Sequence, residues 1–421
     1  MAEGEGVFKL IKAARLINGN GGPPLERAAV LMEGRQVRAV GTEESVVPPE
    51  GTEVLEIDYG DKTILPGLVD CHVHLIGLGD GRAGDELTQL PDEVLTLQAA
   101  RNARAHLYSG VTTVRDCGAK NQTTLMLRQA MEMGITPGPN LVLAGRPVAI
   151  IGGHLSYFGV QATGADECRA AVRQLVKEGV DFIKITATGG STRTSFPLRP
   201  SFTVEELTAI CEEIHKFGKH AASHCVSSQA MSNVLEAGVD TIIHGYFKEP
   251  DGSAKFIPEI ADRMASQGVF VNPTMHGSRG RVQALEAKLE SEGLTDEEST
   301  ILETQRIERE NKLDWFARLK DAGVRLACGS DSAWGNYKMG GFQYEIEAHV
   351  EAGMSNMGAI VSATSDSAES CHVDDAVGTL EPGKQADILV VDGDPSQDIA
   401  ALWNVADVFL NGELVDRSNL V

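Results

Sequence analysis

The sequence predicts an α/β protein in which a (β/α)8, TIM-like barrel is joined to a small β domain formed by both termini. Two observations predict it. Through the middle of the chain, apolar strand-like runs alternate with helical patterns, whereas both ends consist of short strand-like runs broken by turns. Such alternation indicates a parallel sheet covered by helices. With 421 residues, the chain is long enough for a barrel of about 250 residues and a smaller domain.

The β domain is expected to consist of residues 1–66 and 372–421. A hairpin is predicted within residues 28–40, with its turn at Glu33-Gly34-Arg35, and a second hairpin near the C-terminus turns at Asn411-Gly412. Asn-Gly is typical of two-residue hairpin turns because both residues adopt positive φ readily. The alternative is two unrelated strand clusters, one at each end of the chain.

The barrel is expected to span residues 67–371. Helices are predicted at residues 92–109, 122–133, 165–178, 204–217 and 227–237, and each precedes an apolar strand-like run. The segment 278–320 breaks this rhythm because it is long, charged and helical in pattern. We interpret it as an enlarged strand–helix excursion near the mouth of the barrel. Its charges are explained by a solvated helix face, and a lid is the alternative.

Composition excludes several classes of partner. The net charge of −23, from 60 acidic and 37 basic residues, argues against nucleic acid or an anionic membrane surface as a partner. The seven cysteines are scattered and odd in number, which indicates reduced thiols rather than a disulfide framework. No apolar run reaches the about 18 residues of a membrane span, and the first residues lack a cationic leader region. We therefore expect a cytoplasmic protein, and a leader already removed is the alternative.

The most informative motif is the pair His72 and His74, separated by one residue within an apolar run. On a β-strand, residues two apart point to the same face, so both imidazoles converge as two ligands of a divalent metal must. The alternative is a pair of histidines on an edge strand that faces water.

Four later residues share the placement of this pair. Each lies at or near the carboxyl end of an apolar strand-like run, and they are Lys184, His224, His244 and Asp331. In a parallel β/α barrel, active sites are built at that end of the strands. The sequence therefore predicts that all six side chains meet in one metal site.

Several motifs carry a resemblance to a known family. They are the segments 66–74 and 110–116, Lys184, His224, His244-Gly245, residues 329–331 and the closing segment 378–392. Together they resemble the amidohydrolase superfamily, within the branch of imidazolonepropionase-like proteins and metal-dependent, prolidase-like dipeptidases. The resemblance implies that the β domain is a β-sandwich and that the barrel holds two divalent ions, with zinc favoured.

The resemblance also assigns roles to the ligands. One ion would be held by His72, His74 and Asp331, and the second by His224 and His244. Lys184 would be carboxylated by CO2, because an ammonium has no lone pair for a metal whereas a carbamate can bridge both ions. Asp331 would in addition be catalytic, as the group that takes a proton from the attacking water and passes it to the leaving amine.

The expected function is hydrolysis of a C–N bond, amide or peptide-like, in a small substrate such as a dipeptide or an N-acyl amino acid. A hydroxide that bridges the two ions would be the nucleophile. The alternatives are a cyclic amide (imidazolone-like) hydrolase, or a urea, carbamate or ester hydrolase that acts on a xenobiotic. A non-catalytic barrel scaffold is a further alternative, and a homo-oligomer is compatible with any of these functions.

Residues near the strand ends supply candidates for contact with the substrate. His154 is a candidate catalytic and substrate-binding residue, and Arg193 and Arg199 suit a substrate carboxylate because a guanidinium binds it with two hydrogen bonds. Tyr246 and His276 follow barrel strands and are expected to line the pocket. The alternative for all five is an ordinary loop position. The remaining histidines, which are His106, His215, His220, His349 and His372, are expected at helix or surface positions.

Overall fold

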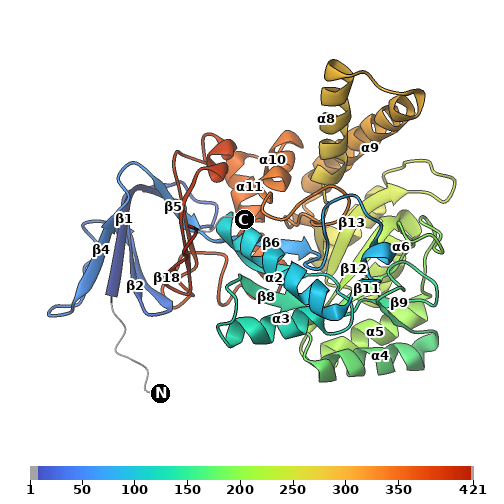
Figure 1. Ribbon diagram of the computed structural model, residues 1–421, viewed down its shortest axis with the longest axis horizontal. Coiled ribbons are helices and arrows are strands. Elements are labelled where there is room, and N and C mark those ends of the chain that lie inside the picture. Colours follow the sequence, from blue (N-terminus) through green and yellow to red (C-terminus); the bar gives the residue numbers. More distant parts are fainter. Residues whose placement is uncertain (1–7, 419–421) are drawn as a thin grey trace.

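The computed structural model describes residues 8–418, and its chain forms a strand-rich domain beside a β/α barrel (Figure 1). The strand-rich domain is one hydrogen-bonded sheet with strands from both ends of the chain. Its strands are β1 (Phe8–Leu16), β2 (Leu25–Glu33), β3 (Gln36–Thr42), β4 (Val54–Asp58), β5 (Thr63–Pro66), β16 (Ile388–Val391), β17 (Val405–Leu410) and β18 (Glu413–Leu414).

The two ends meet where β16 pairs antiparallel with β5, with Ile388 opposite Pro66. This pairing rules out two unrelated strand clusters. The division at residues 66 and 372 itself stays a prediction. Both predicted hairpins form, because Gly34 adopts a φ of 53° in the β2–β3 turn, and Asn411 and Gly412 adopt φ values of 53° and 76° between β17 and β18.

Eight parallel strands form the barrel wall within the described part of the chain. In order around the barrel they are β6 (Leu68–Val73), β7 (Val111–Asp116), β8 (Asn140–Leu143), β11 (Phe182–Thr186), β12 (His220–Ser227), β13 (Thr241–Lys248), β14 (Phe270–Asn272) and β15 (Arg325–Leu326). Two short strands, β9 (Val148–Ala149) and β10 (Val160–Gln161), lie beside β11.

Backbone hydrogen bonds close the ring where the ladders end. The Asp181 amide donates to the Leu143 carbonyl at 2.8 Å, which joins β8 to the start of β11. On the other side, the Cys71 amide donates to Cys328 at 3.1 Å and the His74 amide donates to Ser332 at 2.6 Å, so that β6 is joined to the chain after β15. The observed α/β class with a parallel barrel is the class that the sequence predicts.

Helices cover the outside of the barrel wall. They are α2 (Asp92–Tyr108), α3 (Thr123–Glu132), α4 (Gly164–Glu178), α5 (Val204–Lys216), α6 (Ser228–Ala237), α7 (Pro258–Gln267), α10 (Gln343–Glu351), α11 (Asn356–Ser362) and α12 (Ser365–Ser370). The short helix α1 (Gly84–Leu87) lies in the segment after β6, and the 3-10 helix η1 (Ile399–Trp403) packs against α10. Helix α5 begins with a capping box between Thr203 and Glu206, which satisfies its first free amides. The largest apolar cluster lies between these helices and strands β11 to β15 and includes Phe247 and Ile242.

The charged segment 278–320 forms α8 (His276–Ser291) and α9 (Asp296–Asp321), a helical pair that projects from the barrel (Figure 1). The last turns of α9 bury Trp315, Phe316 and Leu319 against the barrel, whereas its first half carries exposed side chains such as Ile301 and Ile307. The excursion is thus as expected, and its role as a lid stays a prediction. Among residues 8–418, no helix is both long and apolar enough to cross a bilayer.

Candidate metal centre

The imidazoles of His72 and His74 converge on the carboxylate of Asp331. The Nε2 atoms of the two histidines lie 3.3 and 3.5 Å from Asp331 Oδ1, and one ligand atom from each residue lies within 4.8 Å of the other two. The Asp331 amide donates to the His72 carbonyl at 2.7 Å and fixes the two segments side by side. This His-His-Asp group can hold a divalent metal.

Hydrogen bonds fix the orientation of both imidazoles. His72 Nδ1 lies 3.0 Å from Asn272 Oδ1, and His74 Nδ1 lies 3.0 Å from the Gly118 carbonyl. Both partners accept, so each Nδ1 carries the proton and each Nε2 presents a lone pair toward Asp331. Burial and the nearby Lys184 charge lower the pKa of His74 to about 3 and the pKa of His72 well below its ordinary value. Both histidines are therefore neutral, as metal ligands must be.

A second pair, His224 and His244, lies beside the first. Their ring centroids are 4.6 Å apart, and the His244 ring is 5.7 Å from that of His72. His224 Nε2 lies 2.9 Å from the Gly189 carbonyl, and His244 Nδ1 lies 2.8 Å from Thr274 Oγ1. These bonds leave His224 Nδ1 and His244 Nε2 available to bind a metal. Burial lowers the pKa of both rings well below its ordinary value.

Lys184 occupies the middle of β11 and lies between the histidines. Its side chain is buried, and Nζ lies 3.5 Å from His72 Nε2. Burial lowers its pKa from the ordinary value of 10.5, so that the neutral amine is favoured more than in water. Burial has the opposite effect on Asp331, whose pKa it raises to about 7 although Lys184 and Lys312 act to lower it.

Backbone strain accompanies the placement of two of these residues. His244 and Asp331 have φ values of 69° and 56°, in the left-handed region that residues other than glycine seldom adopt. His244 lies within β13 and Asp331 follows β15, and the local turn of the backbone accompanies side chains that join the cluster. Such strain is typical of functional positions, because elsewhere it only destabilises the fold.

The carboxylate of Asp70 holds the segments that carry His72 and Asp331. This role is not predicted from the sequence. Its buried carboxylate accepts from the amides of His72 at 3.1 Å and Ser330 at 2.9 Å, and from His106 Nε2 at 3.0 Å. Asp70 thereby joins the segment before Asp331 to the strand that carries His72. The partner His106 is completely buried, as are His220 at the start of β12 and His349.

The expected surface or helix positions of the five remaining histidines are thus only partly right. His215 lies half-exposed on α5, and His372 is exposed. His106 and His349 lie on helices but face the interior, where the one bonds Asp70 and the other lies 3.5 Å from Glu345. The prediction is wrong for His220, which is neither helical nor at the surface because its ring stacks between Phe182 and His372.

Comparison with known proteins identifies the family. A sequence profile of the amidohydrolase family matches residues 63–415. This chain belongs to the amidohydrolase family. The predicted resemblance is confirmed, and the chain is a hydrolase of this superfamily, whose members act on small molecules.

Individual relatives align with nearly all of this amidohydrolase. It is 26% identical to ochratoxinase from Aspergillus niger over 97% of this chain and 87% of that protein. It is 24% identical to imidazolonepropionase from Bdellovibrio bacteriovorus, over 88% of this chain and 84% of that one. The crystal structure of a Xaa-Pro dipeptidase with bound methionine in its active site is similar with a TM-score of 0.81 and 30% identity, over 97% of this chain and 99% of that one.

Of the predicted substrate-binding residues, His154 and Tyr246 lie at the histidine cluster of the amidohydrolase. The His154 ring is buried and 4.6 Å from that of His224, with Nδ1 3.1 Å from Thr192 Oγ1. Burial and the Lys184 charge lower the pKa of His154 to about 3. The Tyr246 ring is 5.4 Å from that of His244. Their roles toward a substrate stay predictions.

The other three candidates lie farther out. Arg193 is exposed and 3.9 Å from Glu86, and Arg199 is exposed over the ring of Phe196. His276 is buried, but its ring stacks on Tyr344 with the centroids 4.8 Å apart. Within residues 8–418, the structure brings none of these three into contact with the five candidate imidazole and carboxylate ligands. Their substrate roles also stay predictions.

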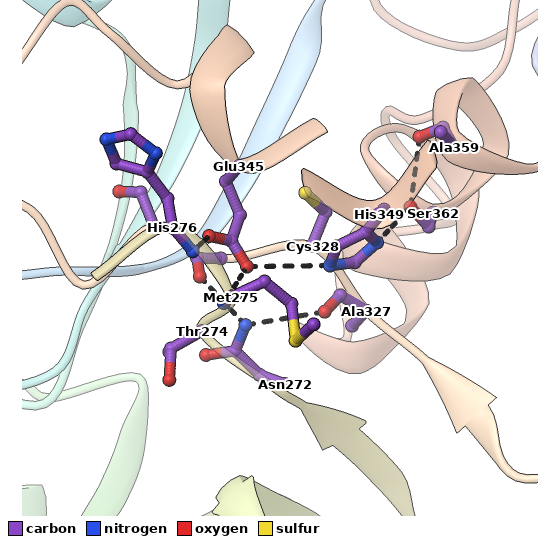
Figure 2. Close-up of polar contacts among 12 residues, drawn as sticks. Asn272, Thr274, Met275, His276, Ala327, Cys328, Glu345, His349, Ala359 and Ser362 are labelled. Atoms are coloured by element: carbon purple, nitrogen blue, oxygen red, sulfur yellow. Dashed lines mark hydrogen bonds and ion pairs between the residues drawn. The ribbon is translucent and has the colours of Figure 1, made fainter. Parts of the chain in front are cut away.

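Two buried charges near the site were not predicted. Lys312, on α9, donates to the Thr274 carbonyl at 3.1 Å, and its Nζ lies 4.4 Å from the centre of the Tyr246 ring. Glu345, on α10, accepts from the amides of Met275 and His276, where α8 begins (Figure 2). Neither residue could be recognised from the sequence, because each lies among other charged residues of a helix, and nothing local marks which of these charges is buried.

Proposed function

We propose that this amidohydrolase cleaves the C–N bond of a small amide that bears a carboxylate, such as a dipeptide or an N-acyl amino acid, with the help of two divalent ions. The observation that carries the proposal is that two histidine pairs, Lys184 and Asp331 converge in one cluster. The similarity to a Xaa-Pro dipeptidase over nearly the whole chain supports the choice of a peptide-like substrate.

The donor atoms fit two metal ions. His72, His74 and Asp331 would hold one ion, and His224 Nδ1 with His244 Nε2 would hold the other, because the second nitrogen of each ring already has a partner. When bound, the ions supply a Lewis acid for the substrate carbonyl and lower the pKa of a bound water to about 7. Neutral imidazoles and a carboxylate suit zinc, although manganese, iron and cobalt accept similar ligands.

Lys184 fits this set as a carbamate. As an ammonium it would repel both ions and offer no lone pair. Its buried position lowers the pKa of the amine, and the neutral amine is the form that reacts with CO2. A bond then forms between Nζ and the carbon of CO2, one amine proton leaves, and the side chain becomes an anion with two oxygen donors.

The residues around the ligands can handle the protons of the reaction. Asp331 Oδ1 lies between the Nε2 atoms of His72 and His74, so its carboxylate is positioned to accept a proton from the attacking water and return it to the leaving nitrogen. His154 is neutral because its pKa is lowered to about 3, and with Nδ1 held by Thr192 it presents Nε2. We assign His154 to the carbonyl oxygen of the substrate.

Lys312 is the basis for preferring a substrate with a carboxylate. It brings a buried cation from α9 to Thr274, whose hydroxyl contacts both His244 and Tyr246. Among the described residues, Lys312 forms no ion pair with a carboxylate, and burial lowers its pKa. A substrate carboxylate beside Tyr246 would provide the missing anion. A neutral urea or carbamate would offer this ammonium no directly bonded anion.

The test is a comparison of matched substrates. A panel of dipeptides and N-acyl amino acids is assayed beside the same compounds with the carboxylate converted to a methyl ester or amide, and beside cyclic amides and ureas. We expect kcat/KM to be at least about tenfold higher for the free acids, since a hydrogen bond to a charged group contributes about 1.5–3 kcal/mol. Lys312→Met should remove this preference, whereas Arg309→Met, on the same helix, should keep it. Turnover of cyclic amides or ureas alone would contradict the proposal.

A further inference from the structure

A cavity of about 320 Å³ lies between barrel helices α2 and α10 and the segment that leads from η1 to the C-terminus. Figure 1 shows α2 and α10 on the side of the barrel that faces the strand-rich domain. The cavity is lined by Arg104, Tyr108, Met339, Gln343, Trp403 and Arg417, among other residues. None of the described residues that line it belongs to the proposed metal centre. Its volume is sufficient for a ligand of amino-acid size.

Two guanidinium groups give this cavity a positive lining. Arg104 Nε is buried and has no hydrogen-bond partner within residues 8–418. Arg417 donates to the carbonyls of Tyr108, Val405 and Ala406, while the nearby carboxylate of Asp407 bonds the Tyr59 hydroxyl. In a chain with 60 acidic and 37 basic residues, two arginines that line a cavity and bond no carboxylate within residues 8–418 indicate a site for an anion.

Gln343 adds an unpaired acceptor to the same cavity. Its side chain is 1% exposed, and Nε2 donates to the Ser109 carbonyl at 2.8 Å and to the Leu402 carbonyl at 3.3 Å. Both bonds orient the amide, and they leave Oε1 without a partner in the described part of the chain. A buried acceptor without a donor is unfavourable, so a ligand whose N–H reaches Oε1 as the amide adjusts on binding would stabilise the site.

The remaining walls are apolar or aromatic. Tyr108, Met339 and Trp403 provide these surfaces, and Trp403 keeps 36% of its exposure. A matching ligand therefore carries a carboxylate for Arg104, an N–H for Gln343 and an apolar side chain. We propose that this cavity is a second ligand site, that it takes a free amino acid with an apolar side chain, and that its occupancy is coupled to the metal centre.

The coupling follows a continuous chain of hydrogen bonds. The amide of Gly340, in the cavity wall, donates to His106 Nδ1 at 2.8 Å, and His106 Nε2 lies 3.0 Å from Asp70 Oδ2. Asp70 in turn accepts from the amide of His72 at 3.1 Å. A ligand that fixes residues 339–340 thus acts on the backbone of a proposed metal ligand.

A second and shorter link strengthens this path. The Ser332 hydroxyl lies 3.2 Å from the sulfur of Met339, and Ser332 directly follows Asp331. Thermodynamic linkage makes this coupling reciprocal. If the ligand changes the affinity for the metal by some factor, the metal changes the affinity for the ligand by the same factor. An apolar amino acid is also the amine product of the proposed reaction, but its binding to this cavity does not depend on that reaction.

Binding is tested on the full-length, metal-loaded protein with L-leucine as the probe. Calorimetry and the change in Trp403 fluorescence should report a site that L-leucinol, which lacks the carboxylate, binds at least tenfold more weakly. Arg104→Met should weaken L-leucine binding at this site by at least tenfold, whereas Arg101→Met, an exposed position on the same helix, should not. Trp403→Phe should abolish the fluorescence signal while calorimetric binding remains.

Specific binding results would contradict the second site. Equal binding of L-leucine and L-leucinol, or unchanged L-leucine binding in Arg104→Met, would overturn the site. Should Arg104→Met fail to fold, Gln343→Met replaces it, with the same tenfold loss expected. For the coupling, saturating L-leucine should shift metal affinity, measured by chelator competition, at least threefold in the wild type and not in the Arg104 variant. An equal shift in both would overturn the coupling. Absence of amide hydrolysis would refute the proposed function and leave these binding results unaffected.

Discussion

The Nδ1 atom of His72 lies 3.0 Å from the side-chain oxygen of Asn272, so a residue on β14 orients a proposed metal ligand on β6. The assignment of the oxygen to His72 is consistent with the other bond of the amide, because Asn272 Nδ2 donates to the Gly329 carbonyl at 2.9 Å. Asn272 thus holds the tautomer of His72 that presents Nε2 to a metal, and also holds the chain just before Asp331.

Replacement of Asn272 by Ala should therefore weaken metal binding without removing a ligand. We expect a loss of about 10- to 100-fold in metal affinity, the usual effect of removing a partner that orients a ligating histidine. The measurement is chelator competition on the purified variant. Asn233→Ala, on the outer helix α6, is the control and should bind metal like the wild type. An Asn272→Ala protein with unchanged metal affinity would show that His72 keeps its orientation by packing alone.

Asp331→Asn should lower turnover far more than metal binding. The amide keeps one oxygen near His72 and His74 but cannot accept a proton. Since general acid–base catalysis contributes about 10²–10⁴-fold, kcat should fall by about that factor, while metal content falls less. Steady-state kinetics and metal analysis of the same sample measure both quantities. If turnover is nearly normal, another group carries the proton, and His154 is the next candidate to replace.

The sequence alone predicts the barrel and the six clustered side chains because both depend on local patterns. A histidine pair two residues apart on an apolar run points one way, and any residue at the carboxyl end of a parallel strand lies at the same rim of the barrel. His224 and His244 illustrate this, since each was recognised from its own strand. Their side chains then lie together because β12 and β13 are neighbours in the sheet.

The supporting residues could not be predicted in this way. Asn272 and His72 are 200 positions apart, and Ser330 and Asp70 are 260 apart, so nothing local to either partner signals the contact. The error for His220 has a similar cause. The sequence predicts a helix or surface position for it, whereas it begins β12 and the rings of Phe182 and His372, from distant segments, cover it. Arg193 and Arg199 show the reverse case, because a glycine-rich loop with arginines does not reveal which way it folds.

Lys184→Ala should lose one of two bound ions and most activity, because the carbamate that we propose supplies an oxygen to each ion. Added short carboxylic acids such as propionate should restore part of both, since they can occupy the space left by the side chain. Metal analysis with and without propionate measures this effect. Lys216→Ala, on the solvent side of α5, is the matched control. Full metal content in Lys184→Ala without propionate would contradict the bridging role.

Glu345 links α10 to the start of the projecting helix α8, and its charge predicts a pH-dependent contribution to stability. The buried carboxylate accepts from the Met275 amide at 2.6 Å and from the His276 amide at 2.7 Å, and it lies 3.5 Å from His349 Nε2 (Figure 2). Burial alone would raise the pKa of Glu345, but the nearby His349 and the hydrogen bonds from the two amides outweigh it, and the pKa is lowered from 4.5. The folded state therefore favours the carboxylate.

The sign of the pH effect follows from that direction. Because the pKa of Glu345 is lower in the folded than in the unfolded chain, its ionisation stabilises the fold above the unfolded value of 4.5, and this contribution is lost as the pH falls through the lower folded value.

Glu345→Gln keeps one acceptor and should destabilise the protein at pH 7 by about 1–3 kcal/mol, since one buried donor then has no partner. Urea unfolding at pH 7 and at successively lower pH should show the difference from wild type shrinking below about pH 4.5. Glu303→Gln, at an exposed position on α9, should match the wild type throughout. A Glu345→Gln deficit that is constant with pH would mean that shape and hydrogen bonding, rather than the charge, hold the start of α8.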